Sequence, residues 1–153
     1  MMDMTAPGDV NEPRDPDRPP VVLQVLPSLV TGGVERGTVE MTQAVAEAEG
    51  VPLVASAGGP MVNLVRRAGG RHFTLPLRSK DPITIWRNAA RLEALIRAED
   101  VAIVHARSRA PAWSAWIACQ RTGAHFVTTY HGVYGEDLPL SGAITASWPR
   151  ARS

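Results

Sequence analysis

The sequence contains a single cysteine, Cys119, among its 153 residues. One cysteine excludes an intramolecular disulfide, and it excludes a zinc site built from several cysteines. A lone cysteine is also consistent with a reducing cytosol. We predict that Cys119 lies on the buried side of a helix, where cysteine acts as a small apolar group.

The chain has almost no excess of charge, because 16 basic residues face 15 acidic ones and the net charge is +1. A dedicated nucleic-acid binder is usually strongly basic, so no nucleic-acid partner is expected. No apolar run approaches the ~20 residues of a membrane span. Residues 1–20 lack the apolar segment of a signal peptide and carry five prolines and five acidic residues. We predict that they form a disordered tail and that the protein is cytoplasmic.

Several well-known catalytic motifs are missing. The sequence has no G-x-x-x-x-G-K-[ST] phosphate loop, and no G-x-G-x-x-G follows its first predicted strand. There is no G-x-S-x-G hydrolase motif. The four histidines lack metal-ligand spacing such as H-E-x-x-H, so no metal site and no bound cofactor are predicted.

Apolar β-rich runs alternate with amphipathic helical patterns along the middle of the chain. Strands are predicted over residues 21–26, 52–57, 71–75, 101–106 and 124–130, and helices over 34–49, 61–68, 82–100 and 111–122. This alternation predicts an α/β fold, namely a Rossmann-like parallel sheet with helices on both faces. Ligands of such sheets bind at the carboxyl ends of the strands.

The junction between the first strand and the first helix reads VVLQVLPSLVTGGVERGTVEM. Gly32 and Gly33 could bring backbone N–H groups close to a phosphate, because no Cβ obstructs the approach and the helix dipole favours an anion. The alternative is a tight turn that binds no ligand. Glu35 falls in the first helical turn, where complementing the dipole is a sufficient explanation for it.

Two further polar segments follow predicted strands. His105, Arg107, Ser108 and Arg109 lie at the end of the fourth strand and directly after it, and they could hold carboxylate, phosphate or sugar hydroxyl groups; a solvated loop is the alternative. His131 closes the fifth strand, with Tyr134 shortly after it. A histidine there could act as an acid or base or could simply bond to the backbone.

Taken together, the segments LPSLVTGGVERGTVEM, SAGGPMVNLVRRAGGRHFTLPL, AIVHARSRAPAWSAW and FVTTYHGVYGE resemble the N-terminal domain of family 4 glycosyltransferases of the GT-B fold. The resemblance covers residues 21–137. It implies a domain that faces a second, nucleotide-binding domain across a cleft. It also implies a metal-free transfer of a sugar from a nucleotide-sugar donor to a glycan or lipid-linked acceptor, with retention of configuration.

The resemblance also implies roles for individual residues. Gly32 and Gly33 would approach the diphosphate of the donor, and His131 would lie near the transferred sugar as the catalytic residue. The remaining candidates would bind the acceptor: His105, Arg107, Ser108, Arg109 and Tyr134.

The pattern fails after Leu140, so residues 138–153 are predicted to form an irregular tail with a non-native ending. The E-x7-E motif of the second domain is absent, and the chain is therefore predicted to be an incomplete GT-B N-terminal domain that is inactive alone. Two alternatives stay open, a non-catalytic acceptor-binding module and one subunit of a split transferase with a separate C-terminal polypeptide. Weak association with the inner membrane face is a further expectation.

Overall fold

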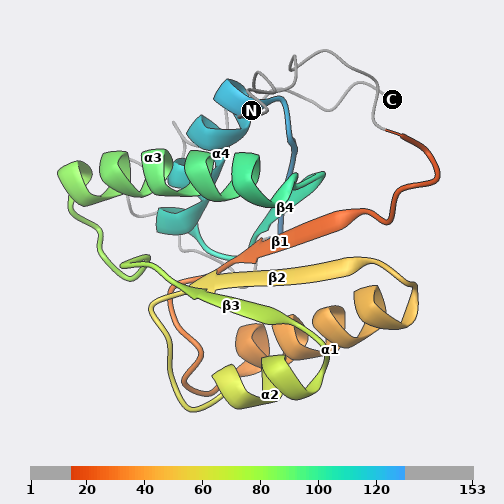
Figure 1. The fold of residues 1–153 in the computed structure, drawn as a ribbon. Helices are drawn as coiled ribbons and strands as arrows, with labels where there is room; N and C mark the ends of the chain where they lie inside the picture. Colours follow the sequence, from red (N-terminus) through yellow and green to blue (C-terminus); the bar gives the residue numbers. More distant parts are fainter. Residues whose placement is uncertain (1–14, 130–153) are drawn as a thin grey trace, which may run out of the picture.

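The computed structural model describes residues 15–129, which contain five strands and four helices in strict alternation (Figure 1). In chain order they are β1 (Val21–Val25), α1 (Gly33–Glu47), β2 (Val51–Ser56), α2 (Val62–Arg67), β3 (Arg71–Thr74), α3 (Pro82–Glu99), β4 (Ile103–Ala106), α4 (Arg109–Thr122) and β5 (His125–Thr128). Every predicted element is present. The predicted tail over residues 1–20 and the predicted irregular end over residues 138–153 lie largely or wholly outside the described residues.

The strands form one parallel sheet in the order β3-β2-β1-β4-β5. Helices α1 and α2 cover one face and α3 and α4 the other, which confirms the predicted Rossmann-like class (Figure 1). The chain moves outward from β1 through β2 to β3 and then returns to the other side of β1 as β4. The loops after β1 and β4 therefore leave in opposite directions, which is the switch point where open α/β sheets bind ligands.

The larger part of the core lies between the sheet and helices α3 and α4. Leu23, Leu53 and Val104 from three neighbouring strands are fully buried there, together with Leu92 of α3. Cys119 of α4 belongs to the same cluster and is 4% exposed, as predicted. Burial raises the pKa of its thiol to about 12, so the unreactive thiol form dominates at neutral pH.

Helix α3 begins as its sequence predicts. The Asp81 carboxylate accepts from the Thr84 backbone N–H at 2.9 Å, and Pro82 occupies the first helical position. Helix α4, however, begins at Arg109 rather than at Pro111. The prediction was wrong by two residues because a proline is tolerated throughout the first turn, where its missing N–H would have no helical partner.

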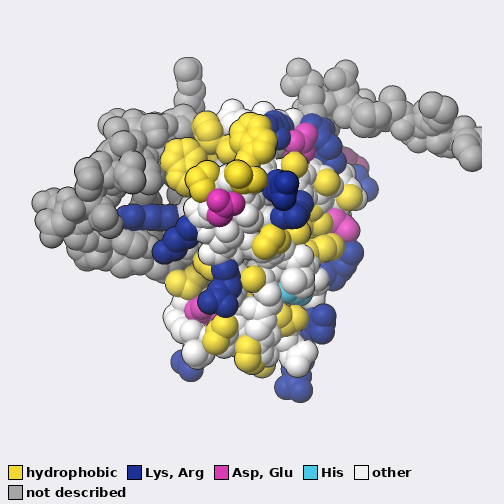
Figure 2. Space-filling view, turned by 90° about the vertical axis from the view of Figure 1, so that its left-hand side faces the viewer, with side chains coloured by type: hydrophobic (Ala, Val, Ile, Leu, Met, Phe, Trp, Pro, Cys, Tyr) yellow, Lys and Arg dark blue, Asp and Glu magenta, His cyan; other side chains and the backbone are white. Residues whose placement is uncertain are grey.

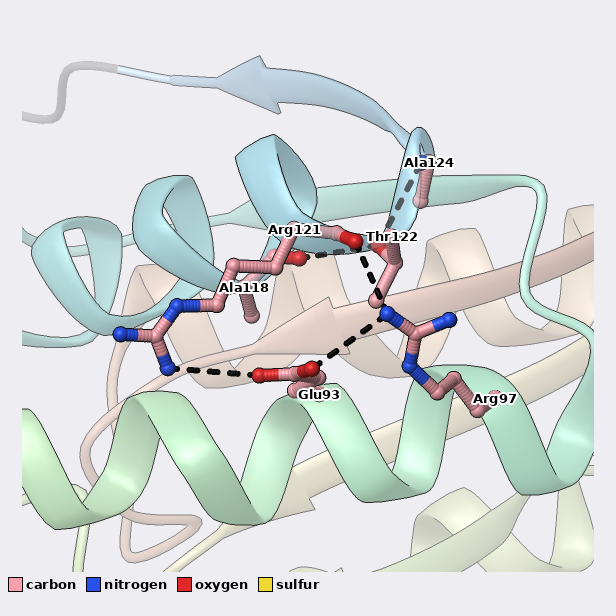
Figure 3. A network of polar contacts seen from close by, with 6 residues as sticks. All are labelled: Glu93, Arg97, Ala118, Arg121, Thr122 and Ala124. Atoms are coloured by element: carbon pink, nitrogen blue, oxygen red, sulfur yellow. Dashed lines mark hydrogen bonds and ion pairs between the residues drawn. The ribbon is translucent and has the colours of Figure 1, made fainter. Parts of the chain in front are cut away.

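The outer sides of α3 and α4 are joined by a small polar network (Figure 3). Glu93 of α3 accepts from Arg121 of α4 and from Arg97 of its own helix, both at 3.3 Å. Arg97 also donates to the Arg121 carbonyl oxygen at 2.9 Å. These partly exposed contacts connect the two helices on the outside of the apolar core.

Apolar side chains also remain on the surface. Ile83 and Trp86 at the start of α3 are 65% and 59% exposed, and Val127 on β5 is 46% exposed. Figure 2, which views the molecule from the carboxyl ends of the strands, shows hydrophobic side chains gathered at the top of this face. Exposed apolar surface of this kind favours association with other molecules. Within residues 15–129, no helix combines the length and the apolar character that crossing a bilayer requires.

Candidate functional site

The loop between β1 and α1 ends in a glycine pair whose two members differ. Gly32 has φ +147°, which favours glycine, and a Cβ there would lie 2.6 Å from the Glu35 carboxylate. A Cβ on Gly33 would meet no atom within 4 Å. Helix α1 has no side-chain cap. The first backbone N–H groups of α1 thus face a surface that no side chain of Gly33 covers.

The glycine loop is held in place by the loop that follows β2. The Leu29 N–H donates to the Gly58 carbonyl, and the Met61 N–H donates to the Leu29 carbonyl, both at 2.9 Å. Ser56, the last residue of β2, accepts from the Gly58 N–H at 3.0 Å and is hydrogen-bonded to His72 Nε2 at 2.7 Å.

His72 therefore ties the start of β3 to the loop after β2 through its hydrogen bond to Ser56. Burial, followed by the positive charge of Arg66, lowers the pKa of its imidazole below the usual value. The Ser56–His72 pair itself was not foreseen, although a serine directly before a glycine-rich turn could have signalled it.

The end of β4 and the segment after it carry four of the predicted site residues, and they take different positions. His105 lies within β4, and its ring Nε2 is hydrogen-bonded to the Thr129 hydroxyl at 2.5 Å. Ser108 is the N-cap residue of α4, and Arg109 is its first helical residue. All three side chains are partly buried.

Arg107 does not point into solvent. It is 7% exposed, and its Nε donates to the Gln24 side-chain oxygen at 2.9 Å. The Gln24 amide in turn donates to the Thr38 carbonyl and to the Thr42 hydroxyl of α1, both at 3.1 Å. Burial lowers the pKa of the Arg107 guanidinium. The structure therefore brings Arg107 together with the glycine-loop helix.

Gln24 was missed by the sequence reasoning. Its signal was available, because it is the one polar residue in the apolar run VVLQVL, and a buried amide requires hydrogen-bond partners. The predicted residues His131 and Tyr134 lie outside the described residues, and their roles stay predictions. Within residues 15–129, no group of three histidine, cysteine, aspartate or glutamate side chains is arranged to hold a metal ion.

Comparison with known proteins identifies the family of this chain. The model of Glycosyltransferase Family 4 matches residues 31–152. The chain belongs to glycosyltransferase family 4. The match extends beyond residue 137, so it includes most of the segment that we predicted to lie outside the domain.

A glycosyltransferase from Rickettsia africae ESF-5 shares 40% sequence identity with this family 4 chain, and the two structures superpose with a TM-score of 0.72. The similarity covers 83% of this chain and 33% of the Rickettsia protein. The family 4 chain thus spans about a third of that relative's length. No curated protein matches the sequence.

Two more distant structures share the fold alone. The C-terminal domain of a hydrogenase from Pyrococcus furiosus has 14% identity and a TM-score of 0.55, covering 72% of this chain and 91% of that one. A putative UDP-N-acetylglucosamine 2-epimerase from Listeria monocytogenes has 14% identity and a TM-score of 0.53, covering 75% and 32%. The different names of these two proteins illustrate that this fold does not determine function.

Proposed function

We propose that this family 4 domain is the acceptor-side part of an enzyme that transfers a sugar, with retention, from a nucleotide-sugar to a glycan or lipid-linked acceptor. The observation that carries the proposal is the open, uncapped start of α1 at Gly33, where the loops after β1 and β4 diverge. Family membership and the Rickettsia africae relative support the general class of reaction.

The donor's diphosphate would bind at Gly32 and Gly33. Backbone N–H groups at a helix start donate hydrogen bonds to phosphate oxygens, and the helix dipole adds partial positive charge. The open space beside Gly33 leaves room for the phosphate to approach the backbone. The proposed reaction needs no metal ion, because the helix start would stabilise the leaving diphosphate.

The acceptor would contact the other side of the switch point. Ser108 and Arg109 at the start of α4 can supply a hydroxyl group and a guanidinium, and His105 lies just before them. Tyr134 would extend this surface. His131 would act beside the transferred sugar, donating a hydrogen bond to developing charge.

We further propose that the chain alone transfers no sugar. In the resemblance described above, a second domain supplies most nucleotide contacts, and donor positioning would depend on it. A separate polypeptide carrying that domain would then be the partner. The active pair would work in the cytoplasm, with weak attachment to the inner membrane face through basic side chains.

The test measures sugar transfer from radiolabelled nucleotide-sugars to a membrane lipid extract. The chain is assayed alone and together with the part of the Rickettsia africae enzyme outside the matched third, and that part is also assayed alone. We expect labelled lipid only in the mixture. Label with the chain alone would disprove the proposed inactivity. Acceptor binding without transfer in any combination would favour a non-catalytic binding module.

A pair of variants at one position tests the glycine loop. Gly33→Ala adds a Cβ in open space and should keep transfer in the mixture, whereas Gly33→Leu should cover the helix start and abolish it. Equal activity of the two variants would place the diphosphate elsewhere.

A further inference from the structure

Arg107 is a buried cation without a buried counter-charge. Its side chain is 7% exposed, and among residues 15–129 its hydrogen-bond partner is the neutral amide of Gln24. The ion pairs of the described residues join other side chains. Burying an unpaired charge is costly, and native proteins usually compensate it with an opposite charge. The arrangement is therefore expected to serve something other than stability.

The guanidinium is held in a fixed orientation. Gln24 accepts from Arg107 Nε, and two α1 groups fix the Gln24 amide in turn, namely the Thr38 carbonyl and the Thr42 hydroxyl. The Arg107 backbone N–H donates to the Val25 carbonyl at 2.9 Å. The backbone N–H and the side-chain Nε of Arg107 are thus both tied to β1. The terminal nitrogens, Nη1 and Nη2, are not sealed from solvent and make no hydrogen bond within residues 15–129.

The fixed guanidinium lies against the first turns of α1. A Cβ on Gly37 would be 3.2 Å from Arg107 Nη1, so the missing side chain of Gly37 makes room for the cation. Gly37 is one turn beyond Gly33, where the uncapped helix carries partial positive charge. Two positive features, the guanidinium and the helix start, therefore lie near each other. The Glu35 carboxylate lies at the same helix start, beside Gly32.

We propose that Arg107 belongs to the donor side of the cleft, where Nη1 and Nη2 bind a diphosphate group together with the start of α1. This inference rests on the proposed function, and it moves Arg107 from the acceptor role that the sequence suggested. Guanidinium groups bind phosphate oxygens with two parallel hydrogen bonds, which suits the two available nitrogens. Gln24 is the positioning residue, because it orients the guanidinium without touching the ligand.

The experiment uses the full chain and inorganic pyrophosphate, titrated calorimetrically at constant ionic strength. The variant Arg107→Gln is compared with Arg36→Gln, which removes a charge of the same sign from an exposed position on α1. We expect Arg107→Gln to weaken pyrophosphate binding by about tenfold or more and Arg36→Gln by less than about twofold. Equal losses in the two variants would overturn the proposal, and so would undetectable binding to the unaltered chain.

Thermal unfolding without ligand separates a binding role from a structural one. A charge retained for a ligand destabilises the empty protein, so Arg107→Gln should unfold at the same temperature as the unaltered chain or higher. A lower unfolding temperature with undiminished pyrophosphate affinity would make Arg107 merely structural. Arg107→Lys provides a second variant if Arg107→Gln fails to fold. It keeps the charge but loses the paired donors, so intermediate affinity is expected, and unchanged affinity would contradict bidentate binding.

Two ligand comparisons identify the anion and its source. Inorganic phosphate should bind more weakly than pyrophosphate, and equal affinities would overturn the diphosphate assignment. Uridine and guanosine diphosphates should compete with pyrophosphate, whereas a short-chain prenyl phosphate should not, and the reverse pattern would assign Arg107 to a phosphorylated acceptor. Because binding is measured without sugar transfer, Arg107-dependent binding would stand even if the transfer assay failed.

Discussion

The two faces of the sheet are built from different chemistry. Under α3 and α4 the buried side chains are almost all aliphatic, with Leu23, Leu53 and Leu92 fully buried. Under α1 and α2 a smaller apolar cluster, which includes Val54 and Val65, lies on the same side of the sheet as the buried polar side chains of Gln24 and Arg107. The first face contributes stability through apolar burial. The second places costly polar groups beside the switch point, and proteins retain such groups mainly where function requires them.

The largest effect should come from breaking the apolar face. Leu92→Ala removes a fully buried side chain of α3 and should lower the free energy of unfolding by about 2–5 kcal/mol. Chemical denaturation measures this loss, and Leu64→Ala, at a position that is 42% exposed, is the control. Pyrophosphate affinity of the folded fraction should not change. A comparable loss at both positions would show that the aliphatic face does not dominate stability.

Disrupting the buried polar contacts should lower the free energy of unfolding by less, and a second substitution should recover most of that loss. Gln24→Leu leaves Arg107 Nε and the Thr42 hydroxyl without their amide partner, and should destabilise the fold by about 1–3 kcal/mol. Replacing Arg107 by Met as well removes the stranded charge and should recover most of the loss. Denaturation of both single variants and the double variant forms a thermodynamic cycle. Additive losses would mean that the two residues are not coupled.

Among the polar contacts, the surface network between α3 and α4 should contribute least to the free energy of unfolding. Glu93→Gln removes the charge that joins Arg97 and Arg121 (Figure 3). Partly exposed ion pairs contribute about 0–1 kcal/mol, so the unfolding free energy should change by less than about 1 kcal/mol. The same measurement at about 1 M salt should shrink the difference further. A loss of unfolding free energy as large as that of Gln24→Leu would show that exposed polar contacts stabilise this protein as much as buried ones.

The smallest effect should appear only as a dependence on pH. The pKa of His72 is lower in the folded chain than its ordinary value of 6.5. The unfolded state therefore binds the proton more readily, and the stabilising contribution is full above pH 6.5 and is lost as the pH falls through the folded pKa. Between pH 7.5 and pH 5, the unfolding temperature should fall more steeply for the unaltered chain than for His72→Asn. His125→Asn, at an exposed position, is the matched control variant.

The sequence predicted the fold because apolar periodicity reports directly on burial. The five strands and four helices were expected. Errors of two residues occurred at the start of α4, at the end of α1 and at the start of β4, which begins at Ile103 rather than at residue 101. Val101 and Ala102 are buried, so their apolar character extended the predicted strand beyond the paired residues. Burial alone does not distinguish a paired strand from the buried turn before it.

The candidate site was only partly predictable. Gly32, Gly33 and residues 107–109 follow β1 and β4 at the carboxyl edge of the sheet, as expected for parallel strands, whereas His131 and Tyr134 lie outside the described residues. The direction of the Arg107 side chain was not predictable, because it depends on which strand lies beside β4. The register that pairs Gln24 with His105 places Gln24 and Arg107 on the same side of neighbouring strands.

The buried Cys119 thiol can be used to detect when helix α4 separates from the core. Because the sequence holds one thiol, each molecule can form one adduct with an alkylating reagent. Burial at 4% exposure and a pKa raised to about 12 protect that thiol while α4 is packed. An opened chain regains the ordinary thiol pKa of about 8.5 and reacts readily. The rate at which the reagent adds to the intact protein, followed by mass spectrometry, therefore measures how often α4 leaves the core.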